Sequence, residues 1–467
     1  MKRLNEFCDV SSDILIKDIK TNSKDIEVGD LFVCIRGVNF DRHDFIDDAI
    51  ERGASAIVVS RDIKSVSVPV VVVEDTNKEL FNLVDKFYDF PLKNLKIIGV
   101  TGTNGKTTVA KILYDMLDDA AYIGTLGVMW KDHRYKINNT TPDIDYLFRY
   151  FKKILNDGIK IVVMEVSSEA FYRRRIDNIK FDISILTNIT EDHLNVHKTL
   201  NNYISCKKQL FLNTKDDGIC ILNKDDDNYD LIIKNLNKKI LTYGTRDTNL
   251  EILNIKEKNN KTVFEIKMDN QYETFVIPLI GKYNVYNFCA CVLVMLSLGL
   301  CIKDIKERIS NIGIVEGRGE FIDKGQDYKI ILDYAHTTDA LKKILSYLNS
   351  IKKANIITVT GSAGGREKEK RKYMGKVVLN MSNYVIFTMD DPRYENVNDI
   401  IDDLVSDSDM TNYERIIDRK EAIYKALNMA KKDDIVLIAG KGRDNYMAIK
   451  DEYLPYSDYD TILSYFE

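Results

Sequence analysis

Short apolar runs separated by longer amphipathic segments are the feature that most constrains how this chain can fold. Residues 95–100, 161–166 and 181–186 are such runs, and they are rich in valine and isoleucine. Strands buried on both faces carry this pattern because neither row of side chains meets water. Alternation of such strands with helices is typical of parallel sheets covered on both faces. The sequence therefore predicts an α/β protein built on parallel sheets.

Three series of strand-like runs divide the chain. The first comprises residues 29–35, 54–59 and 68–73, the second begins at residue 95, and the third comprises residues 328–332, 356–359, 384–387 and 434–438. A chain of 467 residues exceeds the size at which a single core usually keeps growing. We therefore expect three domains, at residues 1–92, 93–312 and 313–467.

The charge balance argues against a large polyanionic partner. The 67 basic and 72 acidic residues give a net charge of −5, and they form no long block of one sign. This distribution does not favour a nucleic-acid or membrane surface. The chain contains no apolar run of about 18 residues, and its seven cysteines are scattered rather than arranged as a disulfide framework. We expect a cytoplasmic protein with small-molecule substrates, no nucleic-acid partner and no stable membrane insertion.

A glycine-rich loop follows the run at residues 95–100. It reads Thr101-Gly102-Thr103-Asn104-Gly105-Lys106-Thr107-Thr108 and leads into a helical pattern. In this context backbone N–H groups cradle phosphates, the lysine reaches the terminal phosphates and the following threonine can hold Mg²⁺. The strict eight-residue pattern would have glycine at Val100, so a plain strand-to-helix turn is the alternative. The order of strand, Gly-Lys-Thr and helix favours a phosphate loop.

This loop resembles the T-G-T-N-G-K-T signature of the Mur ligase family, and further matches extend along nearly the whole chain. Gly29-Asp30-Leu31-Phe32 resembles the uridine-nucleotide domain of the branch that adds the third amino acid of the cell-wall peptide. The resemblance implies an N-terminal uridine-nucleotide-binding α/β domain, a central P-loop ATPase-like parallel sheet domain and a C-terminal Rossmann-like domain. We expect a monomer.

The resemblance assigns ATP contacts to the loop and to three positions beyond it. Asn287 lies in Gly281-Lys282-Tyr283-Asn284-Val285-Tyr286-Asn287, Arg318 in Gly317-Arg318, and Asp333 in Asp333-Tyr334-Ala335-His336. The family directs the aspartate at the nucleotide ribose, whereas a strand-end cap is the alternative for Asp333. The predicted ATP set is Gly102, Thr103, Asn104, Gly105, Lys106, Thr107, Thr108, Asn287, Arg318 and Asp333.

Five residues make up the predicted catalytic and metal-binding centre. Glu165 lies in an E-V-S-S motif and His193 in Thr187-Asn188-Ile189-Thr190-Glu191-Asp192-His193-Leu194, and both motifs carry Mg²⁺ ligands in the family. Lys207 falls where the family carbamylates a lysine, with Lys208 as an exposed competitor. The predicted catalytic residues are Lys106, Glu165, His193 and Lys207, and the predicted ligands of two Mg²⁺ ions are Thr107, Glu165, His193 and carbamylated Lys207. Outside its motif, His193 would read as an ordinary structural histidine.

Contacts with the acceptor substrate are also implied by the resemblance. Ser23 lies in Thr21-Asn22-Ser23-Lys24, where the family has T-D-S-R, and Asn139-Thr140-Thr141-Pro142 matches a substrate-contacting turn. The chain has Glu169 where the family usually has histidine, and Arg173 where it has glutamine. The predicted acceptor set is Ser23, Asn139, Thr140, Thr141, Ser167, Arg173 and Arg175.

Three strand-end motifs of the third domain should select the incoming amino acid. They are Gly364-Gly365-Arg366, Asp390-Asp391-Pro392-Arg393 and Gly440-Lys441-Gly442-Arg443-Asp444. At the second and third motifs the diaminopimelate-adding enzymes carry D-N-P-R and G-K-G-H-E. Arg393 favours a substrate with a distal carboxylate, because guanidinium binds carboxylate bidentately. The predicted amino-acid set is Arg366, Asp390, Asp391, Arg393, Gly440 and Asp444.

The resemblance implies an ATP-dependent ligase acting through an acyl phosphate in peptidoglycan precursor synthesis. It would add meso-diaminopimelate, otherwise L-lysine or a related diamino acid, to UDP-N-acetylmuramoyl-L-alanyl-D-glutamate. Two alternatives remain: a folylpolyglutamate synthetase-like ligase, and a catalytically idle nucleotide-binding relative. The uridine-type N-terminal segment speaks against the first, and the retained Lys106, Glu165, His193 and Lys207 speak against the second.

Overall fold

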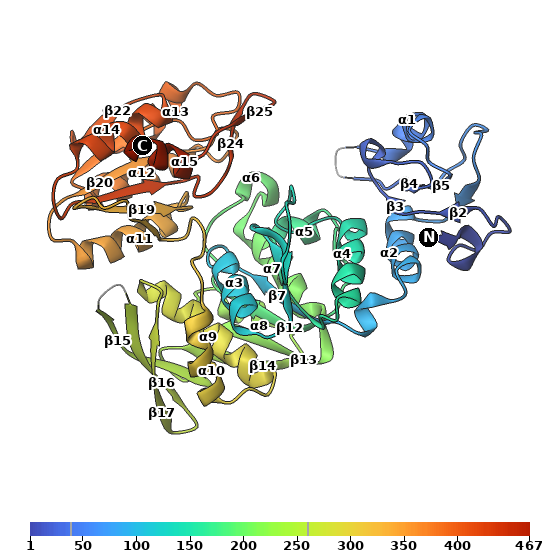
Figure 1. Cartoon of the computed structure of the whole chain (residues 1–467), viewed down its shortest axis with the longest axis horizontal. Helices are drawn as coiled ribbons and strands as arrows, with labels where there is room; N and C mark the ends of the chain where they lie inside the picture. Colours follow the sequence, from blue (N-terminus) through green and yellow to red (C-terminus); the bar gives the residue numbers. More distant parts are fainter. Residues whose placement is uncertain (38–39, 259–260) are drawn as a thin grey trace.

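The computed structural model describes residues 1–37, 40–258 and 261–467 and shows three lobes in chain order (Figure 1). The N-terminal lobe contains a parallel sheet in the order β3-β4-β5-β6 and a separate antiparallel pair, β1 with β2. Its strands are β1 (Lys2–Arg3), β2 (Leu15–Ile16), β3 (Ile19–Lys20), β4 (Leu31–Val33), β5 (Ala56–Val59) and β6 (Val70–Val72), and its helices are α1 (Ile46–Glu51) and α2 (Thr76–Phe87).

An eleven-stranded sheet organises the central lobe, in the order β10-β9-β8-β11-β7-β12-β13-β14-β15-β16-β17. The strands are β7 (Lys96–Thr101), β8 (Ala120–Gly124), β9 (Gly127–Trp130), β10 (His133–Tyr135), β11 (Ile161–Glu165), β12 (Phe181–Leu186), β13 (Thr214–Asn223), β14 (Lys239–Gly244), β15 (Leu250–Lys258), β16 (Lys261–Met268) and β17 (Gln271–Ile277). The stretch from β8 to β15 is parallel, as predicted. Antiparallel strands extend it at both ends, which the sequence analysis did not anticipate.

Helices cover both faces of the central sheet. Ile97 and Ile98, neighbours on β7, belong to two different cores, because successive side chains of a strand point to opposite faces. α3 (Lys106–Met116) and α9 (Lys282–Ser297) pack on one face, and α4 (Ile144–Asn156) and α7 (Leu200–Leu212) pack on the other. The remaining helices of this lobe are α5 (Ser168–Tyr172), α6 (Leu194–His197), α8 (Tyr229–Ile233) and α10 (Ile302–Arg308).

A six-stranded sheet in the order β18-β19-β23-β20-β21-β22 organises the C-terminal lobe. The edge strand β18 is antiparallel to β19, and the other neighbouring strands are parallel. α11, α12 and α13 pack on one face, and α14 and α15 on the other. The elements are β18 (Glu320–Ile322), β19 (Lys329–Asp333), β20 (Ile356–Thr360), β21 (Tyr384–Phe387), β22 (Tyr413–Arg415), β23 (Ile435–Ala439), β24 (Tyr446–Ile449), β25 (Glu452–Pro455), α11 (Thr338–Ile351), α12 (Glu369–Met381), α13 (Val397–Val405), α14 (Arg419–Met429) and α15 (Asp458–Phe466).

The carboxyl ends of the parallel strands carry most of the predicted site residues. Glu165 ends β11, the glycine-rich loop follows β7, and Asp333 ends β19. Ligands of open parallel sheets bind at this edge. Throughout the described part of the chain, no helix is both long enough and apolar enough to cross a membrane.

Candidate active site

The loop between β7 and α3 has the geometry of a phosphate cradle. A Cβ atom at Gly102 would lie 1.8 Å from Thr187 Oγ1, so only glycine allows this close approach. Lys106 begins α3, and its Nζ donates to the carbonyl oxygens of Gly102 and Thr103, each at 2.9 Å. Burial lowers the pKa of Lys106. The helix N-terminus and this lysine together give the loop a positive field that suits phosphate.

Residues at the end of β12 fix the phosphate loop from behind. Asn188 Oδ1 accepts the Asn104 N–H at 3.1 Å, and Asn188 Nδ2 donates to Asn104 O at 3.0 Å. Thr187 Oγ1 also donates to Asn104 O, at 2.6 Å. The Thr187-Asn188 dipeptide was singled out only as part of the histidine motif, and its bracing role was not predicted. Such bracing keeps the cradle in one conformation before ligand arrives.

Glu165 is fully buried beside the phosphate loop. Its Oε2 accepts from Thr107 Oγ1 at 2.9 Å, and its Oε1 accepts from the Thr125 N–H at 2.9 Å and from the Tyr122 hydroxyl. Tyr122 and Thr125 come from β8 and the turn after it, and neither was predicted from the sequence. A carboxylate and a threonine hydroxyl in contact are hard oxygen ligands of the kind that Mg²⁺ prefers.

The predicted acceptor turn lies on the other side of Glu165. Thr141 Oγ1 donates to the carbonyl oxygen of Glu165 at 2.9 Å and accepts the Ser167 N–H at 3.0 Å. Arg175 Nη1 donates to Thr141 O at 3.3 Å, and Thr140 Oγ1 lies 3.2 Å from Thr125 Oγ1. The turn and Ser167 are thus brought to the strand end that also serves the phosphate loop.

Two predicted acceptor residues lie apart from this cluster. Asn139 is exposed one residue before Thr140. Ser23 is buried in the N-terminal lobe, where its neighbour Asn22 accepts from Arg42 Nη1 at 3.0 Å. An elongated acceptor reaching from the N-terminal lobe to Glu165 would be needed to contact both regions.

Glu169 and Arg173, the two departures from the family pattern, bind each other. Arg173 Nε lies 3.0 Å from Glu169 Oε2, as an i,i+4 pair across α5 and its C-terminal cap. Burial alone would raise the pKa of Glu169, but Arg173 holds it below its ordinary value. The second oxygen, Glu169 Oε1, lies 3.8 Å from His193 Nδ1. The two replacements are therefore complementary in charge, and Glu169 faces the predicted catalytic histidine.

His193 stands where the central and C-terminal lobes meet. Its Nε2 lies 3.5 Å from Asp192 Oδ2, and its Nδ1 lies 3.5 Å from Arg366 Nη1 of the C-terminal lobe. Burial lowers the pKa of His193 to about 4, although Asp192 opposes the shift. The imidazole is therefore neutral near pH 7 and keeps a lone pair, as a metal ligand requires.

Lys207 and its neighbour Lys208 have opposite environments. The Lys207 side chain is buried on α7, and its Nζ donates to Gly102 O at 2.8 Å. Burial, followed by the nearby Lys106, lowers the pKa of Lys207 well below its ordinary value. Lys208 is directed away, and its Nζ donates to Leu231 O at 2.9 Å. Of the two lysines, only Lys207 contacts the phosphate loop.

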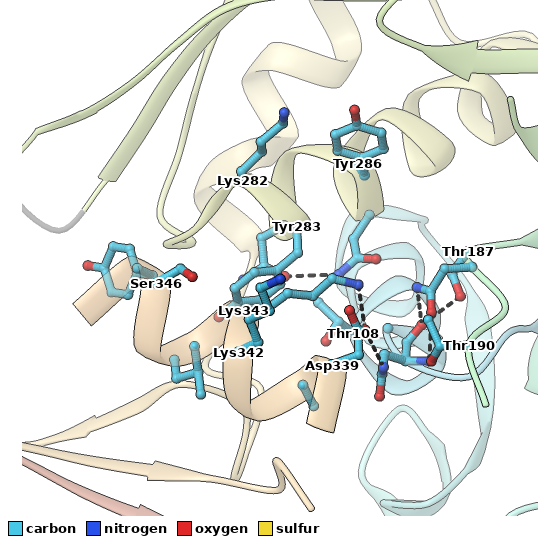
Figure 2. A pocket seen from close by; sticks show the side chains of 18 of the residues that line it. Thr108, Thr187, Thr190, Lys282, Tyr283, Tyr286, Asp339, Lys342, Lys343 and Ser346 are labelled. Atoms are coloured by element: carbon cyan, nitrogen blue, oxygen red, sulfur yellow. Dashed lines mark hydrogen bonds and ion pairs between the residues drawn. The ribbon is translucent and has the colours of Figure 1, made fainter. Parts of the chain in front are cut away.

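A cavity of about 690 Å³ lies between α9, α11 and the phosphate loop. Its walls include the predicted residues Asn104, Gly105, Thr108, Asn287, Arg318 and Asp333. Figure 2 shows Asp339 and Lys343 on α11 across from Thr108 and Thr190 of the central lobe. Asp333 also acts as a strand-end cap, because its carboxylate accepts the Ala335 and Gly319 N–H groups at 2.7 and 2.6 Å. The cavity is large enough for a nucleotide-sized ligand.

A buried lysine organises the predicted amino-acid motifs. Lys441 Nζ lies 2.7 Å from Asp391 Oδ1 and 3.8 Å from Asp444 Oδ2. Asp444 Oδ1 also accepts from Tyr334 OH at 2.8 Å, and burial raises the pKa of Asp444. Buried Asp390 packs so closely on Gly440 that a Cβ there would lie 2.3 Å from Asp390 Oδ2. Both departures from the family motifs, Asp391 and Asp444, therefore share one countercharge.

The two predicted arginines point to different places. Arg366 faces His193, as described above. Arg393 is exposed in the left-handed backbone region, with φ of 52°, and its Cδ lies 3.7 Å from a Cβ built at Gly365. Gly365, the residue before Arg366, thus lies beside Arg393, whereas the Arg366 guanidinium is directed to His193.

The phosphate loop lies between two α/β lobes. This arrangement is typical of nucleotide-dependent enzymes whose site is formed between two domains. Three family models match the chain: "Mur ligase family, catalytic domain" over residues 15–88, "Mur ligase middle domain" over 100–295 and "Mur ligase, glutamate ligase domain" over 317–442. The chain belongs to the Mur ligase family.

Similar proteins match the chain over nearly its full length. The UDP-N-acetylmuramoyl-L-alanyl-D-glutamate–2,6-diaminopimelate ligase of Bacillus cereus is 37% identical over 455 residues, which is 95% of this chain and 92% of that protein. The enzyme of the same name from Clostridium perfringens is 36% identical and covers 97% and 95%. A solved structure of a ligase of that name is 25% identical, with a TM-score of 0.68, and covers 100% and 99%.

Proposed function

We propose that this protein is an ATP-dependent ligase that joins meso-diaminopimelate to the D-glutamyl carboxylate of UDP-N-acetylmuramoyl-L-alanyl-D-glutamate. The observation that carries the proposal is the position of Glu165. Its carboxylate bonds to Thr107 of the phosphate loop, and its carbonyl oxygen accepts from Thr141 of the acceptor turn. One strand end would thus join a phosphate site to an acceptor site, as transfer of a phosphoryl group between them requires.

The reaction has two steps under this proposal. The acceptor carboxylate takes the terminal phosphoryl group of ATP, and the amine of the amino acid then attacks the resulting acyl phosphate and releases phosphate. Lys106 and the N-terminus of α3 stabilise charge on the phosphate oxygens. Arg175, which binds Thr141 O, orients the acceptor turn. The protein contributes mainly positioning and charge stabilisation.

The residues around Glu165 fit Mg²⁺. Across the described residues, no three His, Cys, Asp or Glu side chains converge on one point, so protein carboxylates and imidazoles alone do not complete a metal site. Thr107, Glu165, His193 and a carbamylated Lys207 would hold two ions together with phosphate oxygens. When bound, Mg²⁺ neutralises charge that develops on the transferring group.

Carbamylation of Lys207 is part of the proposal. The lone pair of an unprotonated Nζ forms a bond to the carbon of CO₂, and one proton is released to solvent. The lowered pKa of Lys207 supports this step, because it increases the unprotonated fraction. Lys207→Ala is expected to abolish ligation, with no rescue by bicarbonate, while Lys208→Ala stays active. Full activity of Lys207→Ala would contradict the carbamate assignment.

The amino acid is proposed from the C-terminal lobe. Arg393 lies beside Gly365 in the loop that carries Arg366, and the two arginines would supply guanidinium groups for carboxylates. Asp391 and Asp444 are held around Lys441 and supply acceptors for an ammonium group. A diamino diacid uses both sets, whereas L-lysine lacks the distal carboxylate. The cytoplasmic location, the monomeric state and the domain boundaries at residues 92 and 312 stay predictions.

Phosphate release tests the function directly. Purified protein is incubated with the UDP-linked dipeptide, ATP and Mg²⁺, and with meso-diaminopimelate, L-lysine or a related diamino acid in parallel. Release with meso-diaminopimelate, and a tripeptide product detected by mass, is the expected result. Release that requires a folate and glutamate would favour the folylpolyglutamate alternative, and no release under any condition would favour the idle relative.

A further inference from the structure

One carboxylate outside the predicted site connects the loop of Arg366 to the turn of His193. Glu367 Oε1 accepts the Asn195 N–H of α6 at 2.8 Å, and its Oε2 lies 2.9 Å from Lys370 Nζ. Lys370 Nζ also lies 3.4 Å from Oδ1 of Asp192, the residue before His193. Glu367 and Lys370 belong to the C-terminal lobe, and Asp192 and Asn195 belong to the central lobe. These contacts therefore cross the interface between the two lobes.

The C-terminal side of this contact has a rigid base. The Arg371 side chain is fully buried and binds Glu395 at 2.8 Å and Asp403 at 2.9 Å. Arg371 Nη2 also donates to Ala363 O at 3.2 Å, and Glu395 accepts the Gly365 N–H at 2.6 Å. The loop before α12 is thus held on both sides of Arg366. Arg371 and Glu395 therefore tie the loop to the body of the C-terminal lobe.

The central side depends more on the contact. α6 has only four residues, and its N-cap is His193 itself, in the left-handed region with φ of 56°. The His193 side chain does not cap this helix end, and Glu367 of the other lobe accepts its Asn195 N–H instead. A carboxylate that accepts a backbone N–H at a helix N-terminus is a favourable, charge-assisted partner. The position of His193 is therefore supported across the interface.

We propose that Glu367 is a positioning residue that couples docking of the amino-acid-binding loop to placement of His193. This inference rests on the proposed function for the role of Arg366. Glu367 contacts neither predicted substrate set. It acts through Asn195 on one side and through its fixed neighbour Arg366 on the other. An amino acid bound at Arg366 then holds the lobe docked and, through Glu367, holds the His193 turn in place.

Amide hydrogen exchange of the full-length protein tests the coupling. In the Glu367→Ala variant, the amides of residues 194–197 are expected to exchange about tenfold faster, because a charge-assisted hydrogen bond is lost. Glu367→Gln retains an acceptor for Asn195 but loses the charge facing Lys370, so its exchange should be intermediate. Meso-diaminopimelate should slow exchange in the wild type and not in Glu367→Ala. Equal exchange in wild type and Glu367→Ala would overturn the proposal.

Kinetics separate positioning from folding. Glu367→Ala is expected to lower kcat about tenfold and to raise KM for the amino acid, with an unchanged thermal midpoint. Glu369→Gln is the matched control, since this exposed carboxylate is the first residue of α12 and lies two residues after Glu367. If the wild type shows no ligation but Glu367→Ala still accelerates exchange, the proposed function fails and the docking contact stands. A Glu367→Ala enzyme with wild-type kinetics would refute the positioning role.

Discussion

The two junctions between lobes differ in the polarity of the residues that form them. The N-terminal and central lobes share one continuous apolar core, to which α2 contributes Leu83 and Val84 and α4 contributes Leu147 and Phe148. The central and C-terminal lobes meet mainly through polar contacts, such as Asn104 Nδ2 to Asp339 Oδ2 at 3.0 Å and Asn195 to Glu367, although Ile280 of the central lobe also packs into the C-terminal core. An apolar junction is fixed by burial, whereas polar contacts exchange readily with water. The predicted chemistry lies at the more polar of the two junctions.

The largest effect is expected from breaking the apolar junction. Phe148 is fully buried, and its ring packs edge-on against Phe81 of α2 with centroids 5.5 Å apart. Phe148→Ala should lower the free energy of unfolding by about 3–5 kcal/mol, because it removes buried area and leaves a cavity. Denaturant unfolding measures the change. Phe148→Leu, which fills more of the site, should lose less, and equal losses would argue against a packed junction.

A buried carboxyl group at the same junction gives a pH test. Asp145 Oδ2 accepts from the Thr21 N–H at 3.3 Å, and its Oδ1 is buried without a hydrogen-bond partner among the described residues. Burial raises the pKa of Asp145 to about 6. The folded protein therefore binds this proton more tightly than the unfolded chain, so this group's contribution to stability falls as pH rises from about 4 to about 6.

Asp145→Asn should remove that pH dependence. At pH 7 the variant is expected to gain stability relative to the wild type, by no more than about 3 kcal/mol. At pH 4 the two proteins should be nearly equal. The measurement is the difference in unfolding free energy between variant and wild type across this pH range. A difference that does not change with pH would show that Asp145 is not held protonated by its surroundings.

The polar junction should respond in activity rather than stability. Asp339 binds Asn104 of the phosphate loop and pairs with Lys343 at 2.7 Å. Asp339→Ala is expected to reduce kcat about tenfold, while the thermal midpoint changes little, because the lost contact forms only when the lobes dock. Asp339→Asn retains an acceptor for Asn104 and should recover most of the activity. A large fall in the midpoint would mean that this junction is also structural.

The smallest effect is expected from a surface ion pair beside the apolar junction. Lys152 Nζ lies 2.7 Å from Asp89 Oδ2, and both side chains are partly exposed. Lys152→Ala should change the free energy of unfolding by less than about 1 kcal/mol, since solvent screens such pairs. The free energies of unfolding of Lys152→Ala and Phe148→Ala are measured by denaturant unfolding under the same conditions and compared. A loss as large as that of Phe148→Ala would show that charge, and not burial, holds this junction.

The sequence predicts the parts of the molecule that local patterns encode. The run before the glycine-rich loop is β7, the loop leads into α3 at Lys106, and Lys207 rather than Lys208 contacts the loop. Tyr122 and Thr125 could not be predicted, because they meet Glu165 only through the pairing of β8 with β11. The antiparallel edge strands were missed because their residues, such as those of β16, alternate without a long apolar run.

Some contacts were within reach of the sequence. Glu169 and Arg173 are four residues apart, and this spacing places opposite charges side by side on a helix. Lys441 was named only as part of a glycine-rich motif, although it is the buried countercharge of Asp391 and Asp444. Its role depends on bringing the ends of β21 and β23 together, which no local spacing encodes. Sequence patterns thus show where motifs lie along the chain better than they show which motifs contact each other in the fold.

Glu165 divides its work between two parts of one residue. The side chain serves the phosphate loop, whereas the carbonyl oxygen, which every residue possesses, serves the acceptor turn. A substitution at this position can change the first interaction without removing the second. A change of side chain at this strand end therefore leaves the hydrogen bond to the acceptor turn in place. Selection can alter the contact with the phosphate loop while the acceptor turn keeps its shape.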